Sequence, residues 1–200
     1  MEYNREHLLA FAEAISPCVK GDPTETAEIL IQKYKSLENV FSVDIEELAD
    51  GFSRSLAAHI KLLAYNTSRR GTDRISFGRK LSETEIAEYF KALYVGASVE
   101  QVHLMLLDKS GRVIDVRRVG EGTVNSSEIL PRRMVEVALS VGAAGVYLAH
   151  NHPFGNCRPS EQDVSLTAKM MGIFSSVGIE LLGHVIVAGR RANIIDYTLL

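Results

Sequence analysis

The stretch from residue 145 to residue 163 reads GVYLAHNHPFGNCRPSEQD and joins an apolar run to a polar loop and a helix start. The apolar run Val146–Ala149 predicts a buried strand. Pro153 ends that strand, and a loop with glycine and a second proline follows. Ser160 is a preferred N-cap residue, so a helix is expected from there to about Ser175.

Two histidines and one aspartate in this stretch are candidate metal ligands. His150 and His152 are two residues apart at the strand end, and residues at that spacing point to the same face, about 7 Å apart. Asn151 points the other way and is expected to organise the loop. Asp163 lies in the first turn of the helix, which the loop can fold back over the histidines. With a water in the fourth position, this set predicts a catalytic Zn²⁺ site.

Ordinary structural roles are open for the same residues. The segment from Ser160 to Asp163 is also a plain helix N-terminal cap. Cys157 is an alternative fourth ligand, but a thiolate would close the site to water, so a role in the loop is favoured. His103 and His184 have apolar neighbours and are expected to be hydrogen-bonded histidines of the sheet.

Other metal-binding families fit the stretch less well. Metallo-β-lactamases need an Asp-His pair just after the His-x-His, where this chain has Phe154 and Gly155. Metal-dependent amidohydrolases need further histidine ligands downstream, where only His184 remains. Zinc deaminases use a Glu near the His and a Pro-Cys-x-x-Cys run, and this chain has neither.

The pattern of residues 82–200 mixes helices and strands. Ser82–Glu85 is a plausible capping box that opens a helix to about Leu93. Further elements are expected at 102–107 (strand), 112–119 (strand after a hairpin turn), 131–139 (helix), 179–188 (strand) and 192–195 (strand). This order predicts the α/β (α+β) class, with a sheet flanked by helices.

The first seventy residues carry only helical patterns, and they predict a small all-helical domain at 1–70. Helices are expected at 6–15, from Asp22 onward, at 44–48 and at 53–65. The segment from Asn66 to Lys80 is polar and basic, so a linker is placed at 71–81, before a metal domain at 82–200.

Composition and charge narrow the class of protein. A formal net charge of −3 gives no electrostatic signature of a nucleic-acid-binding protein. The longest mostly apolar run, 137–149, is shorter than the roughly 20 residues that cross a bilayer, so no membrane association is expected. Two distant cysteines, Cys18 and Cys157, make no disulfide framework, and the start of the chain lacks a signal-peptide pattern. A cytoplasmic protein is therefore expected.

The metal-binding stretch resembles the JAMM metallopeptidases. His150-x-His152-Pro153 is followed by Ser160 and Asp163, eight and eleven residues after His152. His-Asn-His-Pro-x-Gly followed by Pro-Ser-x-x-Asp is similar to the RadC (UPF0758) branch. So are Gly122-Thr123, Pro131-Arg132, Ala143-Ala144-x-Val146 and His184-x-Ile186-Val187.

The resemblance implies a fold, an activity and roles for the site residues. The fold would be the mixed sheet shared by JAMM proteins and cytidine deaminases. The activity would be metallopeptidase hydrolysis of a peptide or isopeptide bond in a peptide or protein substrate. His150, His152 and Asp163 would bind zinc, and Ser160 would support the oxyanion. Glu100, just before the first strand, would be the general base; the alternatives are Glu121 and Glu128.

The N-terminal region also resembles RadC, as a degenerate helix-hairpin-helix. Such hairpins bind DNA backbone through glycine-rich turns. Ser53 stands where a second glycine is usual, and residues 1–70 hold eight Lys or Arg against eleven Asp or Glu. This balance opposes phosphate binding. A DNA-associated accessory protein, with a structural or nucleolytic metal domain, is the alternative function.

Overall fold

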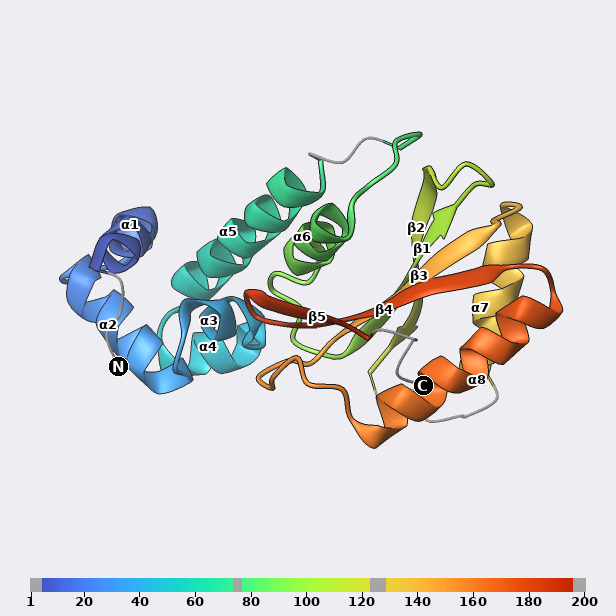
Figure 1. Cartoon of the computed structure of the whole chain (residues 1–200). Coiled ribbons are helices and arrows are strands. Elements are labelled where there is room, and N and C mark those ends of the chain that lie inside the picture. Colours follow the sequence, from blue (N-terminus) through green and yellow to red (C-terminus); the bar gives the residue numbers. More distant parts are fainter. Residues whose placement is uncertain (1–4, 74–76, 123–128, 196–200) are drawn as a thin grey trace.

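The computed structural model describes residues 5–73, 77–122 and 129–195, and its central feature is a five-stranded sheet (Figure 1). In sheet order the strands are β2 (Val113–Glu121), β1 (Gln101–Leu107), β3 (Gly145–Asn151), β4 (Glu180–Ala188) and β5 (Arg191–Ile195). β3 and β4 are parallel, and the other neighbouring pairs are antiparallel. The mixed sheet flanked by helices that the sequence predicts is confirmed.

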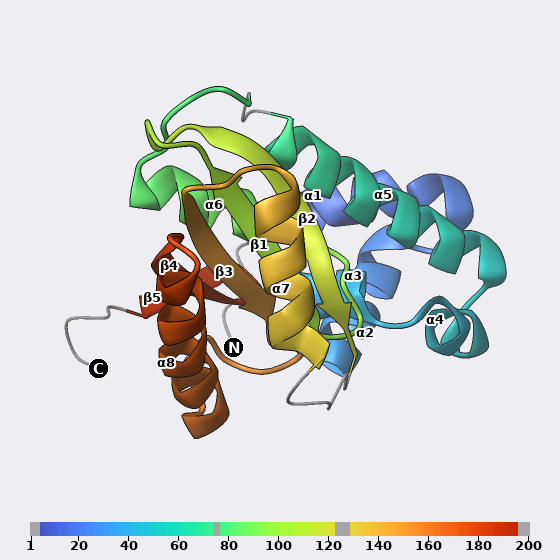
Figure 2. The ribbon, with the colours of Figure 1, turned by 90° about the vertical axis from the view of Figure 1, so that its right-hand side faces the viewer.

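Helices cover both faces of the sheet (Figure 2). On one face, α7 (Ile129–Ser140) and α8 (Glu161–Ser176) pack against Leu104 and Leu106 of β1. On the other face, α6 (Glu83–Leu93) packs against Met105 and Leu107. Because both faces are buried, residues Leu104–Leu107 of β1 form a continuous apolar run and not an alternating one.

Before α6, the described part of the chain forms helices and no strand. They are α1 (Arg5–Ile15), the 3₁₀ turn Ser16–Cys18, α2 (Pro23–Tyr34), α3 (Leu37–Ser42), α4 (Ile45–Gly51) and α5 (Arg54–Thr72). Their buried residues, between Phe11 and Ile60, form a hydrophobic cluster of their own. None of the helices in the described ranges is both long and apolar enough to cross a membrane.

Two N-terminal helices differ from the sequence expectation. The short α3 was not expected, because six residues show no full amphipathic period; the side chain of Ser36 caps it by accepting from the Asn39 amide. The helix expected to end near Tyr65 continues to Thr72, so the start of the polar segment from Asn66 is helical. Packing against α6 favours this extension of α5. The local sequence does not predict that packing.

The contact between α5 and α6 depends on a glycine. A Cβ placed on Gly71 would lie 2.2 Å from the Cβ of Ala92 in α6. Real Cβ atoms do not approach so closely, and neither atom belongs to a flexible side chain. The absence of a side chain at Gly71 therefore lets the two helices touch.

We expect Gly71→Ala to destabilise the protein by about 1–2 kcal/mol. Alanine gains about 1 kcal/mol in helix propensity, but separating two packed helices costs more, as overpacking commonly does. Gly172→Ala in α8 is the matched control: its Cβ would meet no atom within 4 Å, so it should stabilise by about 0.5–1 kcal/mol. Urea unfolding of both variants gives the comparison. Equal stabilisation by the two would contradict the close contact.

Candidate metal centre

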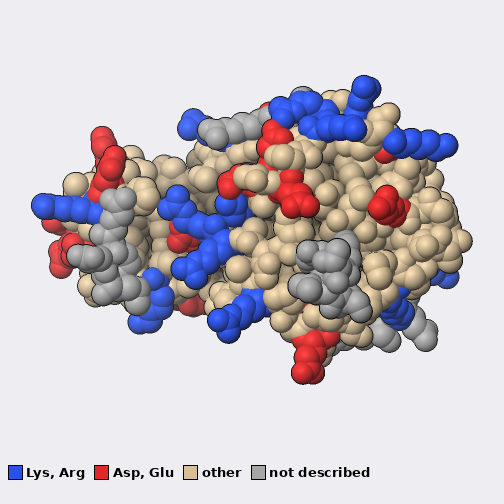
Figure 3. Space-filling view, viewed as in Figure 1, with Lys and Arg blue, Asp and Glu red and all other residues tan. Residues whose placement is uncertain are grey.

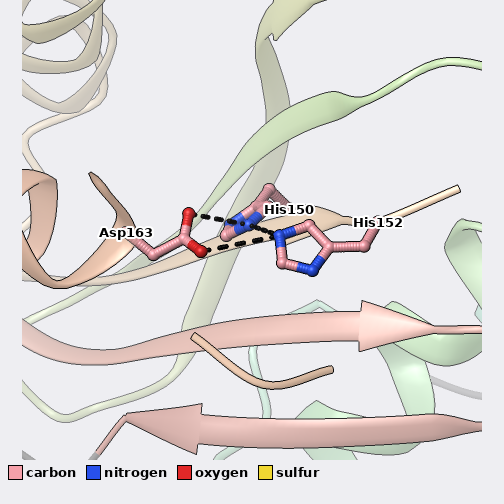
Figure 4. Close-up of side chains that lie close together, drawn as sticks. All are labelled: His150, His152 and Asp163. Atoms are coloured by element: carbon pink, nitrogen blue, oxygen red, sulfur yellow. Dashed lines mark hydrogen bonds and ion pairs between the residues drawn. The ribbon is translucent and has the colours of Figure 1, made fainter. Parts of the chain in front are cut away.

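The end of β3 and the first turn of α8 meet at one edge of the sheet. α8 connects the parallel strands β3 and β4, so it begins where β3 ends. His150 is the penultimate residue of β3, His152 follows β3 directly, and Asp163 is the third residue of α8. Figure 4 shows the three side chains directed toward one another.

The three side chains form a compact donor set. His150 Nε2 lies 3.1 Å from Asp163 Oδ1, and His152 Nε2 lies 3.5 Å from Asp163 Oδ2. The two Nε2 atoms are 2.8 Å apart. One donor atom from each residue lies within 4.8 Å of the others. His150 is 2% exposed and Asp163 9%, whereas His152 is half-buried, so the set opens to solvent on the His152 side.

The chemistry of this donor set fits a divalent cation. His152 Nδ1 lies 2.7 Å from the carbonyl oxygen of Asn156, which can only accept, so Nδ1 carries the proton. The other ring nitrogen, Nε2, is then the atom of His152 that faces His150 Nε2 and the Asp163 carboxylate. Two imidazole nitrogens and one carboxylate oxygen are the ligands of catalytic zinc sites.

Ser160 and Asp163 also form the N-terminal cap of α8. Ser160 Oγ accepts from the Asp163 amide, and its hydroxyl and amide each lie 2.7 Å from Asp163 Oδ2. The cap therefore uses Oδ2, while Oδ1 faces His150, so the two roles that the sequence left open are compatible. Burial acts to raise the pKa of Asp163, but hydrogen bonds with His150 and Ser160 outweigh it and lower the pKa.

The loop between His152 and Ser160 is held by its own polar groups. The Asn156 side chain accepts from the Arg158 amide at 2.9 Å, and the Asn156 carbonyl accepts from His152. Cys157 is half-buried in this loop. Among the described residues, the donor set contains His150, His152 and Asp163 and does not include this thiol.

Glu100 lies directly before β1 and is exposed. Val102 pairs with His150 across β1 and β3, so the backbone of Glu100 lies two residues before the β1 position opposite His150. Its role as general base stays a prediction. Of its rivals, Glu121 pairs with Arg118 at 2.9 Å on the surface. Glu128 lies outside the described residues. So does Thr123, which is part of the similarity to RadC.

Asn151 holds the segment that carries Glu100. Its buried side-chain oxygen accepts from the Gln101 amide at 2.7 Å, and its amide nitrogen donates to the Val99 carbonyl at 3.1 Å. These two bonds lie on either side of Glu100. The sequence predicts that Asn151 organises the loop; in the structure its side chain anchors the start of β1 instead.

His103 and His184 are both buried and hydrogen-bonded, as the sequence predicts, but only one lies at the site. His103 contacts the Tyr94 hydroxyl at 3.1 Å on the α6 face, and burial lowers its pKa to about 4. His184 Nε2 lies 2.8 Å from His150 Nδ1. Burial lowers the pKa of His184 to about 3, so the ring is neutral. The sequence does not predict this contact, because 34 residues separate the two histidines.

A cavity of about 1020 Å³ lies beside the donor set. Its walls come from α3, α5, α6 and residues 94–97, and from residues 151–154 and 187–190. Of the three donor residues, His152 alone lines the cavity. A molecule held there would therefore approach the donor set from its more exposed side.

Comparison with known proteins places the chain in a family. Residues 81–195 match the family of RadC-like JAB domains. A UPF0758 protein of Pseudoalteromonas translucida is 32% identical over 173 residues, covering 83% of this chain and 75% of the relative. A UPF0758 protein of Bordetella avium is 28% identical over 193 residues, covering 92% of this chain and 86% of the relative. With a donor set that could hold a metal ion at the end of β3 and a family match over residues 81–195, the chain belongs to the RadC family.

Proposed function

We propose that this chain is a zinc-dependent hydrolase of the JAMM type, and specifically a metallopeptidase that acts on a peptide or protein. The observation that carries the proposal is the donor set of His150, His152 and Asp163, with two imidazole nitrogens and a carboxylate oxygen within 4.8 Å of one another. The donor set opens beside a large cavity, which gives a peptide or protein substrate room next to His152. The free thiols of Cys18 and Cys157 support a reducing, cytoplasmic compartment.

A zinc ion and two side chains would act on the substrate in this proposal. A zinc ion held by His150, His152 and Asp163 would supply Lewis acidity that brings the pKa of water to about 7. Glu100 takes a proton from the attacking water and later returns it to the leaving amine. The Ser160 hydroxyl, which donates to Asp163 in the structure, turns to donate to the oxyanion that develops on the substrate carbonyl.

Hydrolysis in isotopically labelled water tests this proposal. The full chain, loaded with one equivalent of Zn²⁺, is incubated with a mixed peptide library in H₂¹⁸O. Peptide-bond hydrolysis places one labelled oxygen in each new carboxylate. We expect label in the products of the zinc-loaded protein, none after a chelator removes zinc, and label again after zinc is restored. Labelled products that form equally well without metal would contradict a zinc-dependent reaction.

A measurement of duplex DNA binding distinguishes this proposal from the alternative, a DNA-associated accessory protein. Figure 3 shows acidic side chains interspersed with basic ones over the N-terminal helices. We expect the full chain to bind a labelled duplex more weakly than about 10 μM at physiological salt. Fluorescence anisotropy at low and physiological salt measures this. Sub-micromolar binding that weakens steeply with salt would instead support the alternative.

A further inference from the structure

A buried chain of hydrogen bonds runs behind the donor set, from α8 through β4 to β3. Thr167 Oγ1 lies 2.6 Å from the Asp163 carbonyl oxygen and 2.6 Å from His184 Nδ1. On its other side, the His184 ring places Nε2 2.8 Å from His150 Nδ1. Thr167 and His184 are both completely buried, so protein groups alone satisfy these atoms.

The carbonyl at one end sets the direction of the first bond. A backbone carbonyl oxygen can only accept, and two unprotonated oxygens would repel at 2.6 Å. The Thr167 hydroxyl must therefore donate its single proton to the Asp163 carbonyl. Its oxygen is then an acceptor toward the ring of His184, so His184 Nδ1 carries a proton.

The proton on His184 Nδ1 determines the direction of the hydrogen bond between His184 and His150. A fully buried imidazole is neutral and carries a proton on one nitrogen, since burial of an unpaired charge is costly. With that proton on Nδ1, His184 Nε2 is an acceptor. His150 Nδ1 must then donate to it, which leaves His150 Nε2 with a lone pair. That Nε2 is the atom that lies 3.1 Å from Asp163 Oδ1.

We propose that Thr167 and His184 form a positioning relay that holds the His150 ring with Nδ1 protonated and Nε2 directed as a lone pair at the metal. The inference rests on the proposed zinc site. The relay begins at the carbonyl of Asp163 and ends at the ring of His150, so it also couples the backbone of one ligand to the orientation of another. Outer groups of this kind orient a ligand and raise its basicity.

Replacement of the threonine hydroxyl tests the relay. Thr167→Val keeps the branched shape but removes the group that assigns the proton of His184. We expect its Zn²⁺ affinity, measured by chelator competition, to fall roughly 10–100-fold. Thr167→Ser restores the hydroxyl and should bind zinc nearly as tightly as the unmodified chain. Tyr94→Phe is the matched control, because it removes the partner of another buried histidine, His103, on the opposite face; zinc affinity should not change.

A second measurement reads the tautomer without metal. In the metal-free full chain, nitrogen chemical shifts and ring couplings are expected to show His150 protonated on Nδ1, and a mixture of tautomers in Thr167→Val. A proton on Nε2 of His150 in the unmodified protein would overturn the relay, and so would unchanged zinc affinity in Thr167→Val. Failure of the unmodified chain to bind zinc, with Nδ1 protonated, would refute the proposed function but leave the relay's effect on His150 standing.

Discussion

Replacement of His152 by alanine is expected to reduce bound zinc from about one equivalent to less than about 0.1 equivalent after desalting. The unmodified centre offers three donor atoms within 4.8 Å of one another, and only His150 and Asp163 remain in the variant. A zinc site with two protein ligands and two waters lacks the third donor of catalytic sites, and it loses zinc readily to solution. Metal analysis by mass spectrometry of both proteins measures the loss.

Cys157→Ser is the matched control for this experiment. Cys157 lies in the same loop as His152, and its thiol is the alternative fourth ligand. Because the donor set in the described residues does not include it, the serine variant should keep about one equivalent of zinc. Loss of zinc from Cys157→Ser would make the thiol a ligand. Retention of a full equivalent by His152→Ala would show that the metal is bound elsewhere.

Replacement of Glu100 by glutamine is expected to lower the rate of hydrolysis by roughly 10²–10⁴, the usual contribution of a general base. Glutamine keeps the size and shape of glutamate but cannot take a proton from water. Asn151 bonds to the backbone on both sides of residue 100, so the substitution should leave the segment in place. Zinc content should change little. Initial rates and metal analysis on the same preparation separate the two effects.

Two further variants distinguish a base from a ligand and from a surface carboxylate. Asp163→Asn removes a ligand charge and should lose zinc as well as activity. Glu121→Gln changes an exposed carboxylate that already pairs with Arg118, and it should retain nearly full activity. If Glu100→Gln retains full activity, Glu121 or Glu128 becomes the candidate base. If it loses zinc as readily as Asp163→Asn, Glu100 is a ligand and the proposed mechanism is wrong.

Local sequence was sufficient for the elements that carry the donor set. A short apolar run predicts β3, and the two-residue spacing places His150 and His152 on one face whatever the rest of the fold. Ser160 predicts the start of α8, because a serine cap satisfies free amides at the end of any helix. The extension of α5 to Thr72 was not predictable in this way, because it is favoured by packing against α6 across the close contact of Gly71.

The candidate metal ligands are therefore recognisable from residue order: two histidines with the alternation of a strand and an aspartate in the first turn of a helix. Their surroundings depend on the fold. The antiparallel pairing of β1 with β3 brings the segment of Glu100 beside Asn151, and the parallel pairing of β3 with β4 brings His184 against His150. These contacts join residues 34 or more positions apart, so they depend on strand order and register, which no local pattern of residues specifies.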